Sequence, residues 1–347
     1  MRRAVVTGAA GFIGSHLTER LLSEGVMVDA VDNLSTGDIA NLARVRADEN
    51  FTFHHADICN AAALDRIFPG ADVVFHLAGL ADIVPSIERP QDYYRSNVDG
   101  TFTVMQSARA AAVSRVVYAA SSSCYGLPDI LPTPESAPIR TEYPYALTKY
   151  LGECIVMHWG RVYGIETSAL RLFNVYGPRS RTAGTYGAVF GVFLAQKRAG
   201  QPFTVVGDGT QTRDFTYVSD VAAAFVETAR AALGGEIMNV GSGSTYSVNQ
   251  LVELLGGPVT HIPKRPAEPD GTFADVSKID RLIGWKARVP FATGVATMLE
   301  HLEDWRDAPV WDPAAIERAT AQWFTHLGRD RDTAPAAQLD TVSGAQR

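Results

Sequence analysis

Short apolar runs alternate with amphipathic, helix-length segments through the first two thirds of the chain. From Arg3 a β-branched run, AVVTG, is followed by an amphipathic stretch over residues 12–23 and by a second apolar run, VMVDAVD. This order predicts a strand, a helix and a parallel strand. Further strand-like runs follow: ADVVFHLAG, VSRVVYAAS, ETSALRLFN and EIMNVGS. The predicted fold class is therefore α/β, with a doubly wound parallel sheet.

The pattern changes after Asn174. Gly/Pro turns and short elements, from GPRSRTAGTYG through QPFTVVGDG to VSKIDRLIG, predict a smaller, interleaved substrate lobe. FTYVSDVAAAFVETAR and EIMNVGS look like a further helix and strand of the main sheet. We therefore assign residues 1–173 and 215–242 to a Rossmann domain and residues 174–214 and 243–310 to the lobe. Residues 311–347 are expected to form a helical extension and a mobile tail.

Composition and charge narrow the range of functions. The chain has 347 residues, of which 46% are hydrophobic, enough for a large packed core. The chain has a formal net charge of -7 and no dense run of Lys and Arg. It therefore lacks the positively charged segment that is typical of binding to nucleic acid or to an anionic membrane. Cys59, Cys124 and Cys154 lack metal-ligand spacing, and no run of about 18 apolar residues occurs. We therefore expect a soluble, cytoplasmic protein without a bound metal.

A glycine-rich loop joins the first predicted strand to the first predicted helix. TGAAGFIG contains Gly8, Gly11 and Gly14. Glycines at this spacing let the backbone turn tightly and come close to a pyrophosphate, which the backbone amides at the start of the helix then bind. Alone, the motif fits a plain tight turn equally well. However, Asp32 ends the second predicted strand eighteen residues beyond Gly14, where an acid binds the adenosine ribose in dinucleotide-binding folds. Because DNLSTG offers no arginine for a 2′-phosphate, NAD is predicted rather than NADP.

A tyrosine and a lysine are the first candidates for catalytic groups. YPYALTK holds Tyr145 and Lys149 four residues apart, in a segment without a helix breaker before Gly152. On a helix this spacing puts both side chains on one face. A free tyrosine, with pKa about 10, is a poor base at neutral pH, but a nearby ammonium and a positive nicotinamide lower its pKa. We expect Tyr145 to exchange a proton with a sugar or alcohol hydroxyl.

Together with the run YAASSSCYG, these motifs resemble the extended short-chain dehydrogenase/reductase family, and within it the nucleotide-sugar 4-epimerases of the UDP-glucose/UDP-galactose type. The resemblance spans about residues 3–300 and is carried by VTGAAGFIGSHL, DNLSTG, HLAG, SSSCYG, YPYALTK, RLFNVYGPR, GDGTQTRDFTYVSDV and ADVSKIDRLIGW. It implies C4 epimerisation of a UDP-hexose or UDP-N-acetylhexosamine through a 4-keto sugar, on one tightly held NAD. Tyr145 would take the 4-hydroxyl proton, and Lys149 would tune Tyr145 and bind the nicotinamide ribose.

The resemblance also interprets the serine run. By position in the family motif, Ser121 is the residue expected to form a hydrogen bond with the reacting hydroxyl. Ser122 and Ser123 are the second choices for this role. Cys124 stands where relatives usually have valine, and we expect it to be a buried packing residue. Related 4,6-dehydratases carry an Asp-Glu pair where Ser122 and Ser123 stand, and decarboxylating relatives carry a glutamate at the Ser123 position. Simple epimerisation is therefore favoured.

The remaining site residues are carried over from the family by position. Those expected to bind the cofactor are Gly8, Gly11, Phe12, Ile13, Gly14, Asp32, Asn33, Ser35, Thr36, Gly37, Asp57, Ile58, Leu77, Ala78, Gly79, Asn97, Tyr145 and Lys149. Those expected to bind the substrate are Ala81, Ser121, Ser122, Ser123, Asn174, Arg179, Ala188, Arg213 and Thr272. Arginines suit a diphosphate, although a salt bridge to Asp214 is an alternative for Arg213. An ordinary strand-end role is an alternative for Asp57. The small residues Ala81, Ala188 and Thr272 predict room for an N-acetyl group.

Three segments depart from the family pattern. AEPDGTFAD puts Asp270 in the place of a diphosphate-binding arginine, where an acid would repel the diphosphate unless Arg265 or another cation substitutes. GLADIVPSIERP differs from the commoner GSVPRSI. WRDAPVWDPAAIERATAQWFTHLG adds one or two amphipathic helices of unassigned role.

Alternative interpretations stay open at this point. Another C4-oxidising enzyme of the same scaffold, such as a UDP-glucuronate epimerase, a 3,5-epimerase or a dehydratase, shares most of these motifs. A non-catalytic dinucleotide-binding regulator is a second alternative, although such proteins usually lack the Tyr-Lys pair. Relatives dimerise through two helices, which correspond here to residues 98–112 and 145–163, so we expect a homodimer.

Overall fold

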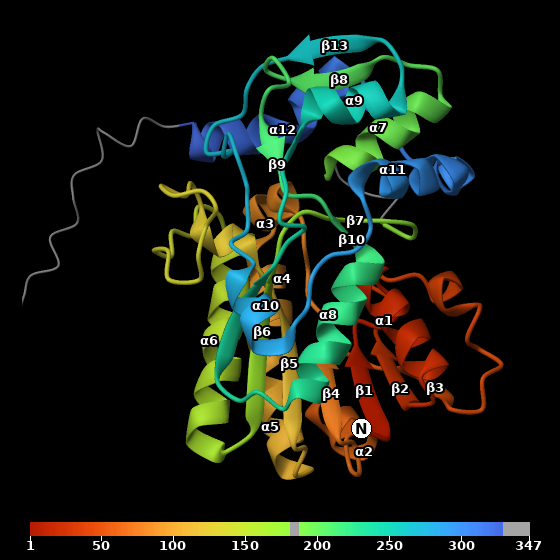
Figure 1. Ribbon diagram of the computed structural model, residues 1–347, viewed down its shortest axis with the longest axis vertical. Coiled ribbons are helices and arrows are strands. Elements are labelled where there is room, and N and C mark those ends of the chain that lie inside the picture. Colours follow the sequence, from red (N-terminus) through yellow and green to blue (C-terminus); the bar gives the residue numbers. More distant parts are fainter. Residues whose placement is uncertain (181–186, 329–347) are drawn as a thin grey trace, which may run out of the picture.

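A parallel sheet forms the centre of the protein. The structure is a computed structural model that describes residues 1–180 and 187–328. Within these residues, seven parallel strands lie in the order β11-β6-β5-β4-β1-β2-β3 (Figure 1). Their bounds are β1 Arg3–Thr7, β2 Met27–Asp32, β3 Phe51–His55, β4 Val73–His76, β5 Arg115–Ser121, β6 Glu166–Leu172 and β11 Glu236–Val240. The doubly wound α/β fold expected from the sequence is confirmed.

Helices cover both faces of this sheet (Figure 1). One face carries α1 (Phe12–Ser23), α8 (Val218–Ala231) and α10 (Ser277–Ile283); the other carries α2 (Ala61–Ile67), α5 (Gly100–Ala110) and α6 (Pro144–Tyr163). The strands are apolar on both sides because both faces are covered. In β1, for example, Val5 belongs to the core under α2, α5 and α6, whereas Ala4 and Val6 belong to the core under α1 and α8.

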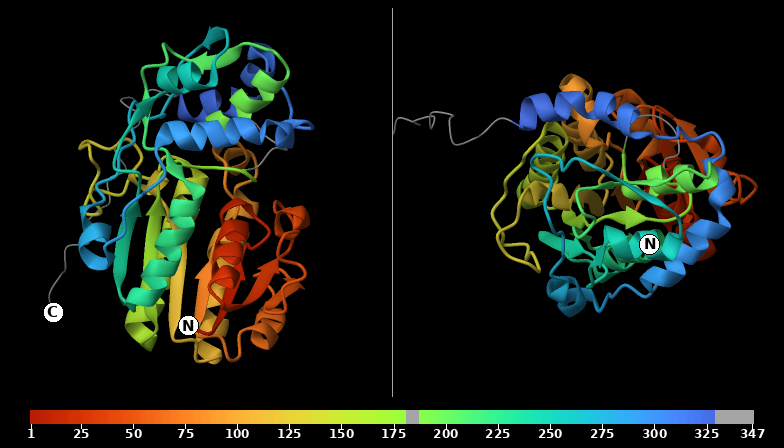
Figure 2. Two further views of the ribbon diagram at one scale, coloured as in Figure 1. Left: turned by 45° about the vertical axis from the view of Figure 1, so that its right-hand side comes forward. Right: turned by 90° about the horizontal axis from the view of Figure 1, so that it is seen from above.

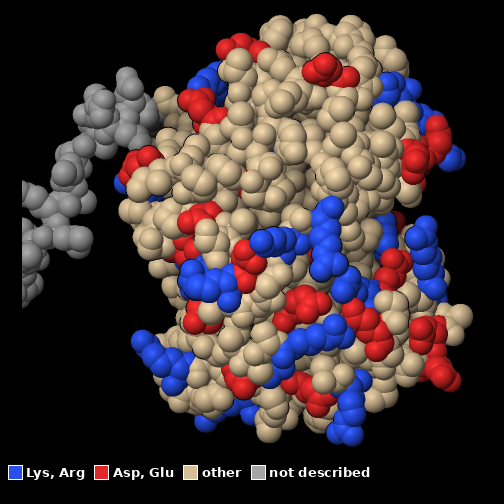
Figure 3. Space-filling model, in the orientation of Figure 1, with Lys and Arg blue, Asp and Glu red and all other residues tan. Residues whose placement is uncertain are grey.

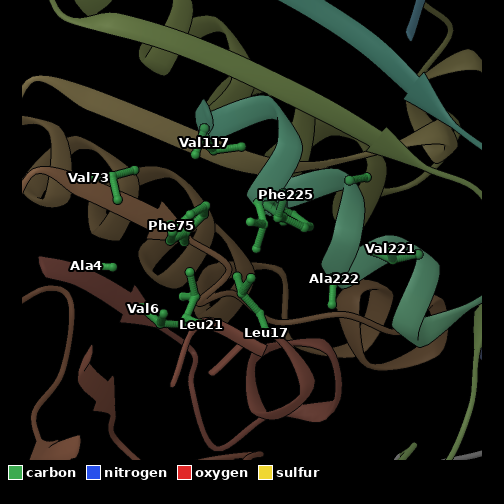
Figure 4. Packing of buried hydrophobic residues seen from close by; sticks show 14 of the residues in the cluster. Ala4, Val6, Leu17, Leu21, Val73, Phe75, Val117, Val221, Ala222 and Phe225 are labelled. Carbon is green, nitrogen blue, oxygen red and sulfur yellow. The ribbon is translucent and has the colours of Figure 1, made fainter. Parts of the chain in front are cut away.

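The core under α1 and α8 joins distant parts of the chain. Figure 4 shows Leu17 and Leu21 of α1 and Phe225 of α8 packed with Phe75 of β4. The rings of Phe75 and Phe225 meet edge to face, with 6.4 Å between their centroids. Since α8 packs here and β11 pairs with β6, the segment 218–240 returns to the sheet after the chain has passed through the smaller lobe.

The smaller lobe lies over the carboxyl ends of the sheet strands (Figure 2). Its elements are β7 Val175–Tyr176, α7 Val189–Arg198, β8 Phe203–Val206, β9 Thr212–Arg213, β10 Thr216–Tyr217, β12 Tyr246–Ser247, α9 Val248–Leu255, β13 Val259–Ile262 and α11 Phe291–Glu300. Aromatic rings fill its core. Tyr176 stacks on Phe190 with 4.6 Å between ring centroids, and Phe215 stacks on Phe291 with 5.1 Å.

The C-terminal extension connects this lobe with the sheet domain. Asp312 caps the N-terminus of α12 (Pro313–Leu327). Ile316 and Trp323 are buried on one face of the helix. Ile316 joins the core of the lobe, while α12 also packs against α3 (Ile83–Glu88), the helix that follows β4. One helix thus touches both sides of the interface.

The visible surface carries interspersed charges of both signs over the sheet domain, whereas the lobe is mostly uncharged in the same view (Figure 3). Within residues 1–180 and 187–328, none of the helices is both long and apolar enough to span a membrane. The mobile tail predicted from about Asp330 lies outside the described residues.

A buried ion pair attaches helix α6 to the sheet. Arg171 of β6 and Glu153 of α6 have side chains 4% and 3% exposed, and two hydrogen bonds of 2.9 and 2.7 Å join the guanidinium to both carboxylate oxygens. Arg171 also donates to the hydroxyl of Tyr125 at 2.8 Å, and that hydroxyl donates to Asn239 Oδ1 of β11 at 2.7 Å. This paired geometry compensates for much of the cost of burying two charges.

Loss of this pair should destabilise the fold. Arg171→Ala leaves the carboxylate of Glu153 buried without its counter-ion, so we expect the free energy of unfolding, measured by urea denaturation, to fall by about 3–5 kcal/mol. Arg140→Ala, which breaks an exposed pair with Asp129, is the control and should unfold like the wild-type protein. Equal stability of Arg171→Ala and the wild type would show that the pair does not hold α6.

Candidate active site

One cavity of about 710 Å³ lies between the carboxyl ends of the strands and the smaller lobe. It brings together most of the residues selected from the sequence: Gly8, Gly11, Phe12, Ile13, Gly14, Asp32, Asn33, Ser35, Thr36, Gly37, Ile58, Leu77, Ala78, Gly79, Ala81, Ser121, Ser122, Ser123, Tyr145, Asn174, Ala188, Arg213 and Thr272. Four of the selected residues, Asp57, Asn97, Lys149 and Arg179, are not among those that line it.

The glycine loop lies where the chains leaving β1 and β4 come closest. Gly8 has a φ of +71°, and a Cβ placed on it would lie 2.7 Å from the backbone nitrogen of Ala78. A side chain on Gly14 would collide with the carbonyl oxygen of Gly8. The loop therefore needs both glycines, and it presents bare backbone to the cavity at the first turn of α1.

Asp32 ends β2 beside this loop. Its carboxylate accepts hydrogen bonds from the backbone N–H of Ala10 at 2.9 Å and of Leu34 at 2.8 Å. Burial raises the pKa of Asp32, and the two backbone donors oppose that rise. The carboxylate is thus fixed at the wall of the cavity next to Gly37.

The candidate catalytic hydroxyls converge at the end of β5. Tyr145, in the first turn of α6, donates a hydrogen bond to Ser121 Oγ at 3.3 Å. Ser121 shares a hydrogen bond of 2.8 Å with the hydroxyl of Ser123, and its Oγ also accepts the N–H of Ser123 at 3.2 Å. Tyr145 and Ser121 both line the cavity, so one hydroxyl of a bound ligand can reach both of them.

Lys149 lies one helical turn after Tyr145, behind the wall of the cavity. Its Nζ is 4.3 Å from the centre of the Tyr118 ring and would be 3.8 Å from a Cβ placed on Gly79. Burial lowers the pKa of Lys149 to about 7, and the charge of Glu153 opposes this. A buried ammonium held over an aromatic ring is a desolvated cation, directed toward the loop that follows β4.

One sequence expectation is not met by the protein's own groups. The predicted lowering of the pKa of Tyr145 involves both the ammonium of Lys149 and a bound nicotinamide. With the protein's own groups alone, burial raises the pKa of Tyr145, and the hydrogen bond with Ser121 only partly offsets this. The negative charge of Asp82, which also lines the cavity, raises it further. Desolvation is the largest of these effects, and the ammonium of Lys149 is not among the causes that change the pKa of Tyr145.

Asn97 supports the cavity from behind. It is 1% exposed and exchanges two hydrogen bonds with the backbone of Leu80, at 2.7 and 3.0 Å. Its amide also donates to Thr148 of α6 at 3.0 Å. Asn97 therefore clamps the loop after β4 to the helix that carries Tyr145.

Cys124 is confirmed as a packing residue. It is 1% exposed, within a small cluster with Tyr125, Phe173 and Ala274. Burial raises the pKa of the Cys124 thiol to about 12, so the reactive thiolate form is not populated at neutral pH.

Arg213 reaches the cavity, but with a different partner from the one considered. Its guanidinium donates to Glu268 Oε1 at 2.9 Å, and Glu268 also forms an ion pair of 3.3 Å with Arg265. Asp214 instead accepts hydrogen bonds from Ser242 N and Oγ, at 2.6 and 2.7 Å. The proposed alternative of an Arg213–Asp214 salt bridge is wrong. Two arginines and one glutamate, all lining the cavity, form its charged wall.

The two acids of AEPDGTFAD, Glu268 and Asp270, lie in different places in the structure. Asp270 is 79% exposed and pairs with Lys264, so it does not face the main cavity. Glu268, two residues earlier, is 22% exposed and does. Of the two acids, Glu268 is therefore the one at the cavity wall, and Arg265 is the second cation of that wall.

Arg179 and Asp57, two further candidates from the sequence, do not line the cavity. Arg179 binds Glu19 at 2.6 Å and the carbonyl of Asn41 at 2.9 Å, which ties its loop to α1. This placement does not support a contact of Arg179 with the substrate diphosphate. Asp57 caps the backbone N–H of Cys59 at 2.8 Å, and this contact favours the ordinary strand-end role.

Tyr143, Glu268 and Trp323 are among the residues of the cavity wall that sequence reasoning missed. The ring of Tyr143 is stacked with that of Tyr145, 6.4 Å away and within 7° of parallel. The motif YPY could have indicated Tyr143, because it places a second tyrosine two residues before Tyr145. For Trp323, which comes from the extension, no signal was present.

Comparisons with known proteins agree with this geometry. The profile of the NAD dependent epimerase/dehydratase family matches residues 4–241. The UDP-glucose 4-epimerase of Mycolicibacterium smegmatis is 36% identical over 309 residues, covering 86% of this chain and 97% of that protein.

Solved structures extend the likeness to three dimensions. The UDP-glucose 4-epimerase of Thermotoga maritima, solved with UDP-glucose, is 30% identical, with a TM-score of 0.80 over 87% of this chain and 99% of that one. The UDP-N-acetylglucosamine 4-epimerase of Methanobrevibacter ruminantium, in complex with UDP-N-acetylmuramic acid, is 31% identical, with a TM-score of 0.81 over 86% and 99%. The chain belongs to the NAD dependent epimerase/dehydratase family.

Proposed function

We propose that this protein epimerises C4 of a UDP-hexose or UDP-N-acetylhexosamine by transient oxidation to the 4-keto sugar. The observation that carries the proposal is the pair of hydroxyls at the end of β5, where Tyr145 donates to Ser121 at 3.3 Å inside the cavity. The glycine loop and the charged wall line the same cavity as this pair, so one cavity offers places for a cofactor, a reacting hydroxyl and a diphosphate.

The residues present fit NAD. Gly8 and Gly14 leave backbone exposed where a Cβ would close the approach, and Asp32 holds a carboxylate at the ribose position. The wall between Asn33 and Gly37 carries no cationic side chain, which favours a ribose without a 2′-phosphate. When bound, NAD supplies the hydride acceptor and donor of the reaction. Lys149, behind Gly79, would hold the nicotinamide ribose.

Tyr145 is the proposed acid and base. Its hydroxyl takes the proton from the sugar 4-hydroxyl as C4 is oxidised, and Ser121 holds the same oxygen by a hydrogen bond. Burial raises the pKa of Tyr145, so positive charge close to the ring is needed for it to act as a base. The keto sugar then turns about its bond to the diphosphate and presents its other face, and Tyr145 returns the proton.

Arg213 and Arg265 are the proposed diphosphate ligands, and the hexose lies among small residues. Asn174 accepts a hydrogen bond from Thr272 at 2.6 Å, which fixes both at the cavity wall. Ala81 and Ala188 also line it. The room that they leave supports acceptance of an N-acetyl group. Ser122 and Ser123 offer no acid for elimination, which weighs against a dehydratase.

We also propose that the protein forms a homodimer and is located in the cytoplasm. The outer side of α5 and α6 exposes an aromatic cluster, in which Phe102, 44% exposed, meets Trp159 with 5.3 Å between ring centroids. Val162 and Tyr163 continue it, at 51% and 41% exposure. This patch supports a homodimer through α5 and α6. The three cysteines are free, as suits a cytoplasmic protein.

The domain boundaries belong to the same proposal. Residues 1–173 with 215–242 would form the NAD-binding domain, residues 174–214 with 243–310 the substrate lobe, and residues 311–347 the extension and tail. The return of α8 and β11 to the sheet supports this division.

Product analysis without added NAD tests the proposal. The purified protein is incubated with UDP-glucose, UDP-galactose, UDP-N-acetylglucosamine, UDP-N-acetylgalactosamine and UDP-glucuronate, and products are resolved by NMR. We expect interconversion of a glucose/galactose or N-acetylglucosamine/N-acetylgalactosamine pair. Turnover of UDP-glucuronate alone, or no turnover by protein that contains NAD, would refute it.

Tyr145→Phe should remove the proton-transfer group and leave the cavity intact. We expect turnover to fall by about 10²–10⁴-fold, while the amount of bound NAD, measured in the denatured protein by absorbance, stays unchanged. Tyr143→Phe removes a hydroxyl from the neighbouring stacked ring and should keep most of the activity. Activity of Tyr145→Phe within tenfold of wild type would exclude Tyr145 as the acid and base.

Glu268→Gln should strengthen binding of the diphosphate. The change removes the negative charge that pairs with Arg213 and Arg265, so we expect UDP to bind up to about tenfold more tightly in isothermal titration. Asp270→Asn is the matched control, because Asp270 is exposed and pairs with Lys264, and it should change affinity little. Weaker binding by Glu268→Gln would mean that Glu268 orients the arginines rather than competing with the ligand.

Phe102→Glu should separate the proposed dimer. It puts a charge into the aromatic cluster, and we expect a monomer by light scattering where the wild type is a dimer. Ile130→Glu, at an exposed loop residue outside α5 and α6, should leave the mass unchanged. A dimer that persists in Phe102→Glu would place the interface elsewhere.

A further inference from the structure

Trp323 reaches the cavity from the C-terminal extension. It is 3% exposed and lines the cavity. Its indole N–H donates to the carbonyl of Pro266 at 2.7 Å, and the guanidinium of Arg265 lies 5.5 Å from the ring centre. With its polar atom satisfied by the backbone, the rest of the indole is available as an apolar surface.

Two ring contacts connect Trp323 with Tyr145. Its ring lies 6.4 Å from that of Tyr143, and Tyr143 lies 6.4 Å from Tyr145. The reacting C4 must lie at the hydroxyl of Tyr145. Trp323 is therefore two ring contacts away from Tyr145, at the part of the cavity wall that also carries Arg265.

Three segments that depart from the family pattern come together around α12. The loop 265–270 receives the indole hydrogen bond, and α12 packs against α3, from the segment GLADIVPSIERP. Ile83 and Val84 of α3 line the same cavity. These segments are far apart in the sequence, so chain connectivity alone does not bring them together. Figures 1 and 2 show α12 running along the edge of the lobe above α3.

The contacts also connect the extension with the charged wall. Trp323 holds Arg265 and the backbone of Pro266, Arg265 pairs with Glu268, and Glu268 pairs with Arg213. The relatives described above are covered almost completely by the match, yet part of this chain has no counterpart in them. The extension thus contributes Trp323 to the wall of the cavity, next to the loop that carries Arg265 and Glu268.

We infer that α12 is part of the substrate site and that Trp323 determines specificity by contacting the sugar portion of the nucleotide sugar. The apolar face of the indole packs on the C–H face of the hexose or on its acylamino substituent, while the loop that Trp323 holds keeps Arg265 at the diphosphate. This inference rests on the proposed function and assigns the extension a role in it.

Binding of ligands with and without a sugar tests the inference. UDP, UDP-glucose and UDP-N-acetylglucosamine are titrated calorimetrically into wild type, Trp323→Ala, Trp323→Phe and Phe324→Ala, each first checked for bound NAD and thermal midpoint. Phe324 neighbours Trp323 on α12 but is 40% exposed and serves as the control.

The diagnostic quantity is the ratio of the Kd for UDP to the Kd for the tighter-binding UDP-sugar. We expect this ratio to fall about tenfold in Trp323→Ala, because the contact with the sugar is lost, and to stay near the wild-type value in Trp323→Phe and Phe324→Ala. An unchanged ratio in Trp323→Ala would overturn the inference, whether both affinities fall equally or neither changes.

Failure of the proposed function is distinguishable from failure of this inference. If wild-type protein neither binds nor interconverts any UDP-sugar, the proposed function fails and the role of Trp323 falls with it, before any variant is compared. If wild type interconverts a UDP-sugar pair and only the ratio in Trp323→Ala is unchanged, the proposed function stands and α12 is a structural support.

Discussion

The cavity depends on one close backbone contact, between Gly8 after β1 and Ala78 after β4. These strands are neighbours at the middle of the sheet, where its winding reverses, and their carboxyl ends open a crevice there. A Cβ on Gly8 would lie 2.7 Å from the nitrogen of Ala78, so only glycine lets the two loops meet. The cofactor loop, the loop 77–81 and the first turn of α1 all take their positions from this contact.

A second set of interactions fixes the catalytic helix against that frame. Asn97 binds the loop after β4 to Thr148, and the buried Arg171–Glu153 pair ties α6 to β6. Tyr145 and Ser121 thus belong to the part of the molecule that these contacts hold together, whereas the charged wall and Trp323 come from the lobe and the extension. This division suits a reaction in which the reacting groups stay fixed and the keto sugar turns.

The sequence predicted the sheet, the glycine loop and the Tyr145–Ser121 pair because each follows from local pattern or from a motif shared with the family. It did not predict the partner of Arg213, because Glu268 is 55 residues away in the chain. The comparison with the family pattern drew attention to Asp270 instead. Nor did it predict Trp323, since an amphipathic helix shows which residues are buried but not against what. The raised pKa of Tyr145 follows mainly from its burial among residues of other elements, which spacing on one helix does not reveal.

The central claim is that C4 is oxidised and reduced by the same cofactor without exchange with water. The most direct measurement is epimerisation of a UDP-hexose carrying deuterium at C4, followed by NMR of the product. The account predicts that the product keeps the deuterium at C4, because the hydride leaves and returns within one cavity. Replacement of the deuterium by hydrogen from the solvent would contradict it and would point to proton removal from carbon.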